Sequence, residues 1–118
     1  MKEFKLSYNR LNRKGLKTGI WEEYYKSGEL YSKGSYINDL KEGEWEYYHR
    51  NGLMFYNGFY KNGEMNLIWE WYYSNGQLMK KGSYKNGIRE GIWEEYYASG
   101  KLVRKGDYLN GIYNSIDV

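Results

Sequence analysis

An internal repeat constrains the fold of this chain more than any other feature. Tryptophan recurs at positions 21, 45, 69 and 93, a constant spacing of 24 residues, and tyrosine, glycine and asparagine columns keep the same phase. The unit reads G-x-W-E-x-Y-Y-x-x-G-x-L-x-x-K-G-x-Y-x-N-G. Such a period is typical of proteins that stack one supersecondary unit on the next. We therefore expect a single domain over residues 1–118. It has repeats at about 16–39, 40–63, 64–87 and 88–111, a degenerate N-terminal cap at 1–15 and a tail at 112–118.

Two turn signals in each unit identify the repeated element as a β-hairpin. One is Ser-Gly or Asn-Gly, as at Ser27-Gly28, and the other is Asn-Gly or Asn-Asp, as at Asn62-Gly63. Asn-Gly between aromatic runs favours a type I′ turn, in which both central residues have positive φ. We predict a two-residue turn at each end of the unit. The expected fold is all-β: a single elongated, twisted antiparallel meander sheet of tandem hairpins.

The composition agrees with strands and tight turns. Aromatic residues make up 20% of the chain, beside 15 glycines and no proline. A disordered segment would lack the aromatic residues, and a helical bundle would avoid so much glycine and tyrosine. Aromatic runs separated by regularly placed glycine remain the pattern of β-structure.

The expected register separates two faces of the sheet. Pairing across the turns places Trp21 opposite Gly34, Glu22 opposite Lys33 and Tyr36 opposite Lys41. The later units pair the equivalent positions, and three of the four pairs in the Glu22 column have opposite charges. The face with the tryptophans is called the aromatic face below, and the face with the Glu–Lys pairs the polar face. We expect each tryptophan ring to cover the glycine opposite it. The turns are separated by 11 and 13 residues alternately, which predicts a slanted sheet.

No catalytic or metal-binding constellation is visible in the sequence. The chain has one histidine, His49, no cysteine and only three aspartates, whereas a metal site needs several converging ligands. His49 stands in a column otherwise filled by tyrosine, and the paired glutamates have Lys or Arg partners across the strands. We therefore predict no enzymatic activity, no cofactor and no small-molecule substrate. The first residues contain no apolar run, which favours a cytoplasmic protein.

The repeat resembles MORN repeats, in the bacterial variant typified by the YwqK antitoxin family. The segments that carry the resemblance are GIWEEYYKSGELYSKGSYINDLKEGEW and WEWYYSNGQLMKKGSYKNGIREGIWEEYYASGKLVRKGDYLNG, within about residues 15–111. The resemblance implies an elongated sheet of hairpins and an immunity protein that neutralises a cognate toxin by direct contact. Other MORN proteins look like scaffolds or membrane-associated modules, which is the alternative function. The sequence departs from the pattern at Leu67, where Gly is expected, at His49 and at Asp39.

Variation between the units predicts where a partner binds. The central units replace smaller or charged residues by large ones, and the register places all of these on the aromatic face: Tyr47, His49, Tyr56, Met65, Leu67 and Trp71. Tyr, Trp and Met are favoured at protein–protein contacts. We predict a partner-binding patch formed by these six residues. The alternative is that they fill a core under a curled sheet.

Other partners have weaker support in the sequence. Aromatic residues beside lysines could stack on single-stranded nucleic acid, but a net charge of only +3 argues against that partner. A lipid surface would require a basic or amphipathic face, and the lysines are scattered. A protein, with a toxin as the suspected case, is therefore the expected partner.

Overall fold

The computed structural model describes residues 7–116, which form ten β-strands. These strands are β1 (Arg10–Leu11), β2 (Lys17–Tyr24), β3 (Leu30–Ile37), β4 (Leu40–Tyr48), β5 (Met54–Lys61), β6 (Glu64–Tyr72), β7 (Leu78–Lys85), β8 (Ile88–Tyr96), β9 (Leu102–Leu109) and β10 (Ile112–Ser115).

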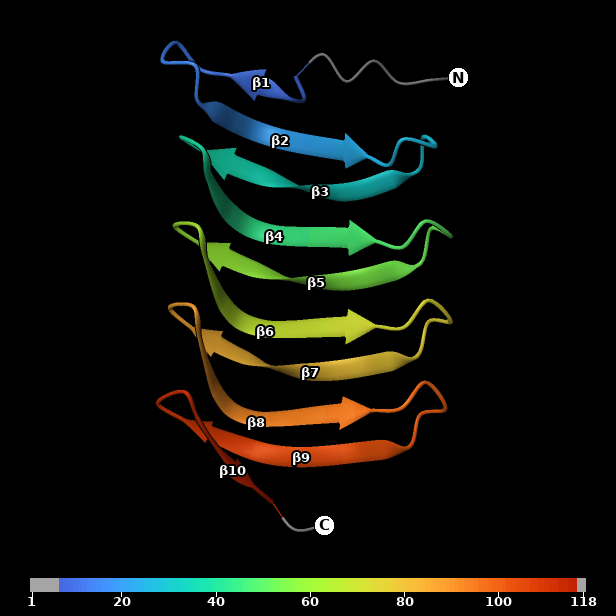
Figure 1. Cartoon of the computed structure of the whole chain (residues 1–118). Coiled ribbons are helices and arrows are strands. Elements are labelled where there is room, and N and C mark those ends of the chain that lie inside the picture. Colours follow the sequence, from blue (N-terminus) through green and yellow to red (C-terminus); the bar gives the residue numbers. More distant parts are fainter. Residues whose placement is uncertain (1–6, 117–118) are drawn as a thin grey trace.

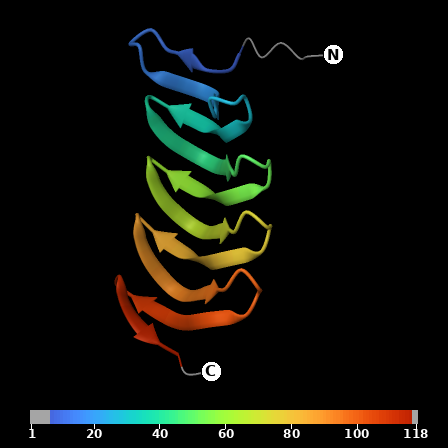
Figure 2. The ribbon, with the colours of Figure 1, turned by 45° about the vertical axis from the view of Figure 1, so that its right-hand side comes forward.

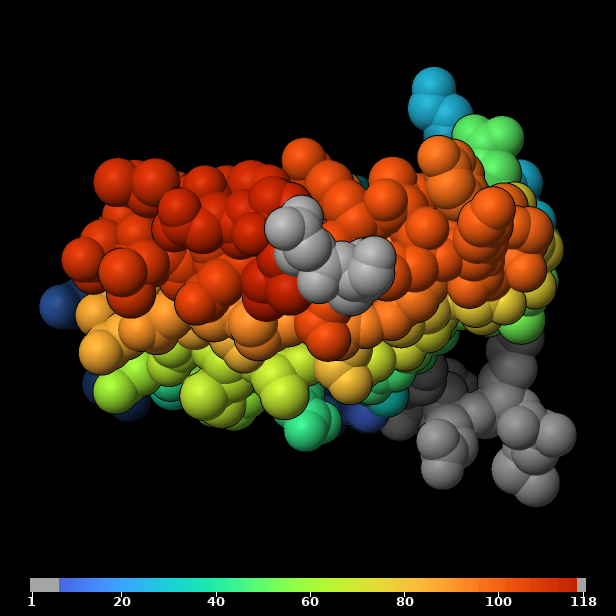
Figure 3. All heavy atoms as spheres, turned by 90° about the horizontal axis from the view of Figure 1, so that it is seen from below, coloured from blue at the N-terminus to red at the C-terminus, as the bar shows by residue number. Residues whose placement is uncertain are grey.

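All ten strands belong to one antiparallel sheet in which every strand pairs with its neighbour in sequence (Figure 1). This single meander confirms the predicted fold class. The sheet measures 52 × 31 × 19 Å, and its strands are bowed, as the turned view shows (Figure 2). Seen from below, the stack ends in β10 and β9, whose atoms lie in front (Figure 3).

The Asn-Gly turns lie along one edge of the sheet and have the predicted conformation. Ile37 pairs with Leu40 across two residues, Asn38 and Asp39, whose φ values are 48° and 69°. The later turns repeat this geometry, with Asn62 at 51° and Gly63 at 81°. Positive φ at both central residues is the type I′ geometry that matches the twist of a hairpin.

The turns along the opposite edge are longer than predicted. The Tyr25 amide donates to the Glu29 carbonyl at 2.9 Å, and the Gly28 amide donates to the Tyr25 carbonyl at 2.9 Å. Residues 26–28 therefore form a three-residue loop, and the expected two-residue turn is wrong. Glu23 still pairs with Ser32 because the extra loop residue is compensated by a bulge between that pair and the next.

A second bulge keeps the sheet from slanting. In the β3–β4 pair the register shifts between Ser35–Glu42 and Lys33–Glu46, and β5–β6 and β7–β8 shift at the equivalent place. The shift cancels the unequal spacing of the turns, so that equivalent strands stack in line (Figure 1). The predicted slant is therefore wrong. The bulged strand turns at Gly43, whose φ is 80°.

A ladder of rings runs along the aromatic face. Tyr36 contacts Trp45 edge-on at 5.0 Å between ring centroids, and the Tyr60–Trp69 and Tyr84–Trp93 pairs repeat this contact. The indole N–H of each of these three tryptophans donates to a backbone carbonyl, as Trp45 does to Ser35 at 3.0 Å. Trp69 is fully buried, so the ladder is the core of this single-layer sheet.

The glycines opposite the tryptophans allow these rings to lie flat on the backbone. A Cβ added at Gly34 would lie 2.0 Å from the ring of Trp45. The expected pairing of Trp21 with Gly34 is confirmed for the backbone. The covering ring comes from the following unit, however, because the bulge brings Trp45 over Gly34.

Both ends of the stack are formed by degenerate units. At the N-terminal end, the Asn9 side chain donates to the Glu22 carbonyl at 2.9 Å and accepts from the Glu22 amide at 2.7 Å, as a neighbouring strand would. At the C-terminal end, β10 pairs with β9 and places Tyr113 over Gly106. The first six residues of the expected cap and the last two of the tail lie outside the described residues.

Candidate binding surfaces of the central units

Three of the six predicted binding residues form a continuous stack on the aromatic face. The rings of Tyr47 and Tyr56 are stacked at 4.0 Å between centroids, and Tyr56 stacks on Trp71 at 6.2 Å. Trp71 also lies under Lys80, whose Nζ is 4.4 Å from the ring centroid. These three residues therefore lie together, and their role in partner binding stays a prediction.

Tyr47 belongs to the core of the sheet. Its side chain is only 3% exposed, and its hydroxyl accepts a hydrogen bond of 2.7 Å from Lys41 Nζ. Burial, followed by the hydrogen bond with Tyr60, raises the pKa of Tyr47 well above its usual value. Desolvation likewise lowers the pKa of Lys41. Tyr47 thus offers no free surface to a partner, and the alternative of a filled core fits this residue.

Met65 interrupts a column of cations above the tryptophans. Lys17, Lys41 and Arg89 lie 4.8, 4.9 and 4.4 Å from the ring centroids of the tryptophans of their own units. Met65 occupies the same column in the third unit and pairs with Tyr60. The cation–π contacts hold these positive charges against the rings and partly desolvate them.

His49 takes over a structural hydrogen bond of its column. Tyr25 donates its hydroxyl to the Tyr48 carbonyl at 2.6 Å, and His49 Nε2 lies 2.8 Å from the Tyr72 carbonyl. A carbonyl oxygen only accepts, so Nε2 carries the proton in this contact. His49 also stacks on Phe55 at 4.3 Å, and it therefore links neighbouring units as the tyrosines do.

Leu67 does not join the aromatic patch. It occupies the bulge position that holds glycine in the other units, and its φ is 59°. Its side chain is 57% exposed and lies on the polar face, beside Phe59 and Ile68. The register pairs Leu67 with Tyr84, yet Leu67 lines the hollow beside Phe59 and Ile68. The positive φ at this bulge position therefore departs from the strict alternation on which its assignment to the aromatic face depends.

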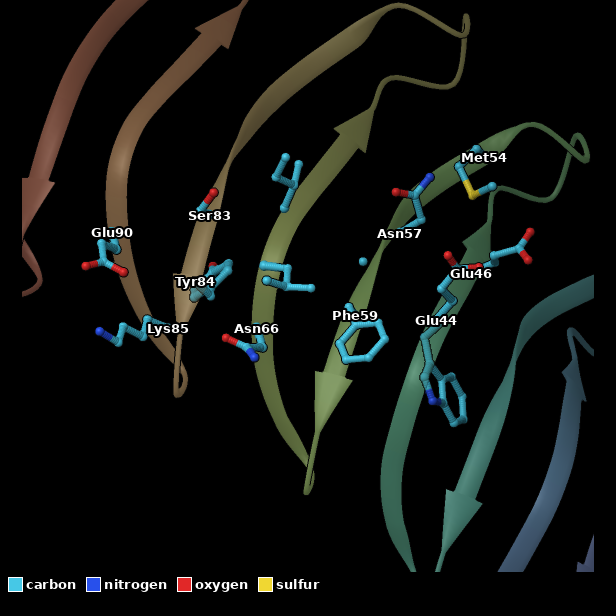
Figure 4. Close-up of a pocket in the computed structure, with 14 residues that line it drawn as sticks. Glu44, Glu46, Met54, Asn57, Phe59, Asn66, Ser83, Tyr84, Lys85 and Glu90 are labelled. Atoms are coloured by element: carbon cyan, nitrogen blue, oxygen red, sulfur yellow. The ribbon is translucent and has the colours of Figure 1, made fainter.

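A hollow of about 990 Å³ lies on the polar face of the central units. It extends from β4 to β8, and Phe59 projects into it between Glu44 and Asn66 (Figure 4). In the strand register, Phe59 pairs with Glu44 on one side and with Asn66 on the other. The hollow thus brings together an apolar floor and a rim of carboxylates and amides.

The sequence prediction missed two residues of this hollow, although the repeat contains the signal. Phe59 stands in a column that otherwise reads Ser35, Ser83 and Asp107. Glu44 stands in a column that is otherwise isoleucine. Both are departures of the second unit on the polar face. The predicted patch contains only residues assigned to the aromatic face.

Residues 7–116 contain neither a cluster of metal ligands nor a membrane-spanning helix. No group of His, Asp and Glu side chains within this range could hold a metal ion. Across the same range, no helix has the length and hydropathy to cross a membrane.

The fold and the surfaces define a class: a single-layer β-repeat protein whose exposed central face is available for contact. The family model of the MORN repeat variant matches residues 17–38, 65–86 and 89–110. These matches cover more than half of the chain, which therefore belongs to the MORN repeat variant family. The unit at 40–63 lies outside the three matches, and it contains Glu44 and Phe59.

The comparisons identify the repeat and no specific partner. No curated protein matches the chain significantly. The family assignment makes the chain a repeat-based binding or scaffold module, and MORN repeats in general serve protein or membrane interaction. The resemblance to the YwqK antitoxin family in particular stays a prediction.

Proposed function

We propose that this chain is a non-enzymatic protein-binding module whose contact surface is the hollow on the polar face. The observation that supports the proposal is the exposure of Leu67. This large apolar side chain is 57% exposed, and its backbone has a left-handed conformation. Such a conformation costs a non-glycine residue on the order of 1 kcal/mol, and strain of this kind is concentrated at functional sites. The other units use glycine at this position and avoid the cost.

The two faces differ in what they offer a partner. On the aromatic face the large rings pack on one another, and the N–H groups of Trp45, Trp69 and Trp93 donate to backbone carbonyls within the sheet. On the polar face, Leu67 and Ile68 are 57% and 55% exposed and lie together with Phe59. Exposed apolar side chains rimmed by polar groups are the usual composition of a protein interface.

The finer proposal is that the module is an immunity protein, an antitoxin that neutralises a cognate bacterial toxin in the cytoplasm. Its support is the resemblance of the repeats to the YwqK antitoxin family. A rigid sheet neutralises an enzyme by covering its active site or a surface it needs, and the inhibitor requires no chemistry of its own. The absence of a metal cluster from the described residues is compatible with such a role.

Affinity capture followed by a growth assay tests the proposed function. The tagged chain is incubated with lysate and secretions of its source cells, and the eluate at high salt is identified by mass spectrometry. We expect one stoichiometric protein whose expression arrests growth and whose effect is relieved by co-expression of this chain. Retention of lipid alone, or of a protein that is harmless when expressed, would overturn the antitoxin role and favour a membrane-associated or scaffold module.

The matched variant for this experiment is Phe59→Ser/Leu67→Gly, which gives the central units the residues of their neighbours. If the hollow is the contact surface, this variant loses the partner and the growth rescue. The control is Tyr97→His, an exposed position outside the hollow that receives the residue of the second unit. The control should retain both activities.

A further inference from the structure

We infer that the hollow on the polar face binds an extended peptide segment that carries basic residues on either side of a large apolar one. This inference rests on the proposed function and names the chemistry of the partner. It follows from the apolar floor of the hollow, from the charge of its rim and from the distance between the acidic side chains.

The floor of the hollow is apolar and exposed. Phe59 on β5 and Leu67 and Ile68 on β6 come from adjacent strands. Leu67 and Ile68 each expose more than half of their side chain. Covering these groups removes apolar surface from water, at about 25 cal/mol per Å². An apolar side chain of the partner therefore belongs at the centre of the hollow.

The rim of the hollow is acidic at both ends. Glu44 on β4 and Glu90 on β8 line it, and no ion pair among the described residues engages either carboxylate. Glu46 lies on the rim beside Glu44, and Lys85 is the cation that also lines the hollow. The carboxylates outnumber the lysine, so the rim attracts a cationic segment and repels the anionic surface of a membrane.

The spacing of the two glutamates sets the spacing of the basic residues. Glu44 and Glu90 are separated by four strand intervals, from β4 to β8, or about 19 Å at the usual distance between paired strands. An extended chain covers about 3.4 Å per residue. A peptide that crosses the strands would therefore place its two basic residues roughly five or six positions apart, with the apolar residue between them.

Among the four units, only the central ones supply the residues of the hollow that depart from the repeat. The first unit has Ile20 and Ser35 where the second has Glu44 and Phe59. The bulge position is glycine in every unit but the third, which has Leu67. Three departures from the repeat thus converge on one surface, and each can be reversed by a residue that the fold already accepts elsewhere.

A random peptide library displayed on phage, selected against the full-length chain, tests this inference. Enriched peptides are synthesised, and their affinity is measured by fluorescence anisotropy at two salt concentrations. We expect basic residues at the predicted spacing around a large apolar residue, and weaker binding at the higher salt concentration. Enrichment of acidic peptides, of peptides without basic residues, or of none at all would overturn the inference.

Matched variants locate the binding. Glu44→Gln/Glu90→Gln should weaken binding about tenfold, and Phe59→Ser/Leu67→Gly should weaken it by at least about tenfold. Glu23→Gln/Glu95→Gln makes the same change of charge on the aromatic face and should have no effect. Equal losses in both glutamate variants would show a nonspecific effect of charge and contradict the site. Circular dichroism confirms that each variant is folded.

The outcome is separable from that of the proposed function. Basic peptides that bind in the hollow, together with no captured protein, would leave the chemistry of the site standing and remove the antitoxin role. A captured toxin whose binding is insensitive to all hollow variants would do the reverse.

Discussion

The two faces of the sheet are formed by the same strands but have opposite roles in the molecule. On the aromatic face, Trp69 is completely buried and its N–H donates to the Phe59 and Asn66 carbonyls at 3.2 and 3.1 Å. On the polar face, Phe59 and Leu67 line an open hollow. The difference teaches that a single-layer sheet can use one face as its core and keep the other free for recognition.

This division depends on glycine as much as on the aromatic residues. A flat ring over a glycine lets each tryptophan reach the backbone of the neighbouring strand, as Trp69 does over Gly58. Burial is thereby achieved without a second layer. We therefore expect substitutions on the aromatic face to lower the free energy of unfolding more than equivalent substitutions on the polar face.

The largest effect is expected from removing a ring of the ladder. Trp69→Ala should lower the free energy of unfolding by about 4 kcal/mol, because the side chain is fully buried and leaves a cavity. Phe59→Ala on the polar face should lower it by about 1 kcal/mol or less. Chemical denaturation followed by circular dichroism measures both. Equal losses would mean that the polar face is also core.

Gly58→Ala should cost about 3 kcal/mol, because the new Cβ would lie 2.0 Å from the Trp69 ring. The matched control is Gly91→Ala at the bulge, where no atom lies within 4 Å and only a φ of +74° is unfavourable. That control should cost about 1 kcal/mol. Equilibrium unfolding of the two variants would refute the role of ring packing if Gly91→Ala were the more destabilised.

Alkaline pH should lower the free energy of unfolding by ionising tyrosines that are partly buried on the aromatic face. Burial raises the pKa of Tyr56 to about 12, above its value of about 10 in an unfolded chain. The folded protein disfavours the phenolate, so this contribution is complete below pH 10 and is lost as the pH rises from 10 towards 12. Tyr56→Phe should remove about 1 kcal/mol of the loss, after allowance for solvent screening. Denaturant midpoints of the unchanged protein and of Tyr56→Phe are measured across this pH range. Equal losses of stability in the two proteins would show that Tyr56 does not cause the loss.

The smallest effect on stability is expected at Leu67, with the opposite sign. Leu67→Gly relieves a left-handed backbone, with φ at 59°, at the cost of greater freedom in the unfolded chain. We expect a gain of about 0.5 kcal/mol in the free energy of unfolding, together with loss of partner binding. Thermal denaturation and the capture experiment report the two effects. A clear loss of stability would show that Leu67 has a structural role.

The fold could be predicted because residues that recur at a constant spacing indicate which positions pair across neighbouring strands. Four residue types that recur in phase predicted the hairpins, and the Asn-Gly turns required one backbone conformation. The opposite turns could not be predicted, since Ser27-Gly28 fits a two-residue and a three-residue loop equally well. The bulge at Gly43 was also missed, because a glycine within a strand pattern does not by itself say in which direction the register shifts.

The site was harder to predict than the fold. The sequence brought Tyr47, Tyr56 and Trp71 together, but only packing shows that Tyr47 is core. Strict alternation placed Leu67 on the aromatic face, but Leu67 has a positive φ at a bulge and lines the hollow with Phe59. A residue at an irregular position in a strand therefore has to be assigned from the backbone.

Hydroxyl-radical footprinting of the chain with its captured partner shows directly whether the partner binds the polar face. We expect Phe59 and Leu67 to be strongly protected in the complex, whereas Tyr56 and Trp71 keep the reactivity they have in the free protein. Protection of Tyr56 and Trp71 with unchanged Phe59 and Leu67 would place the contact on the aromatic face and contradict the account.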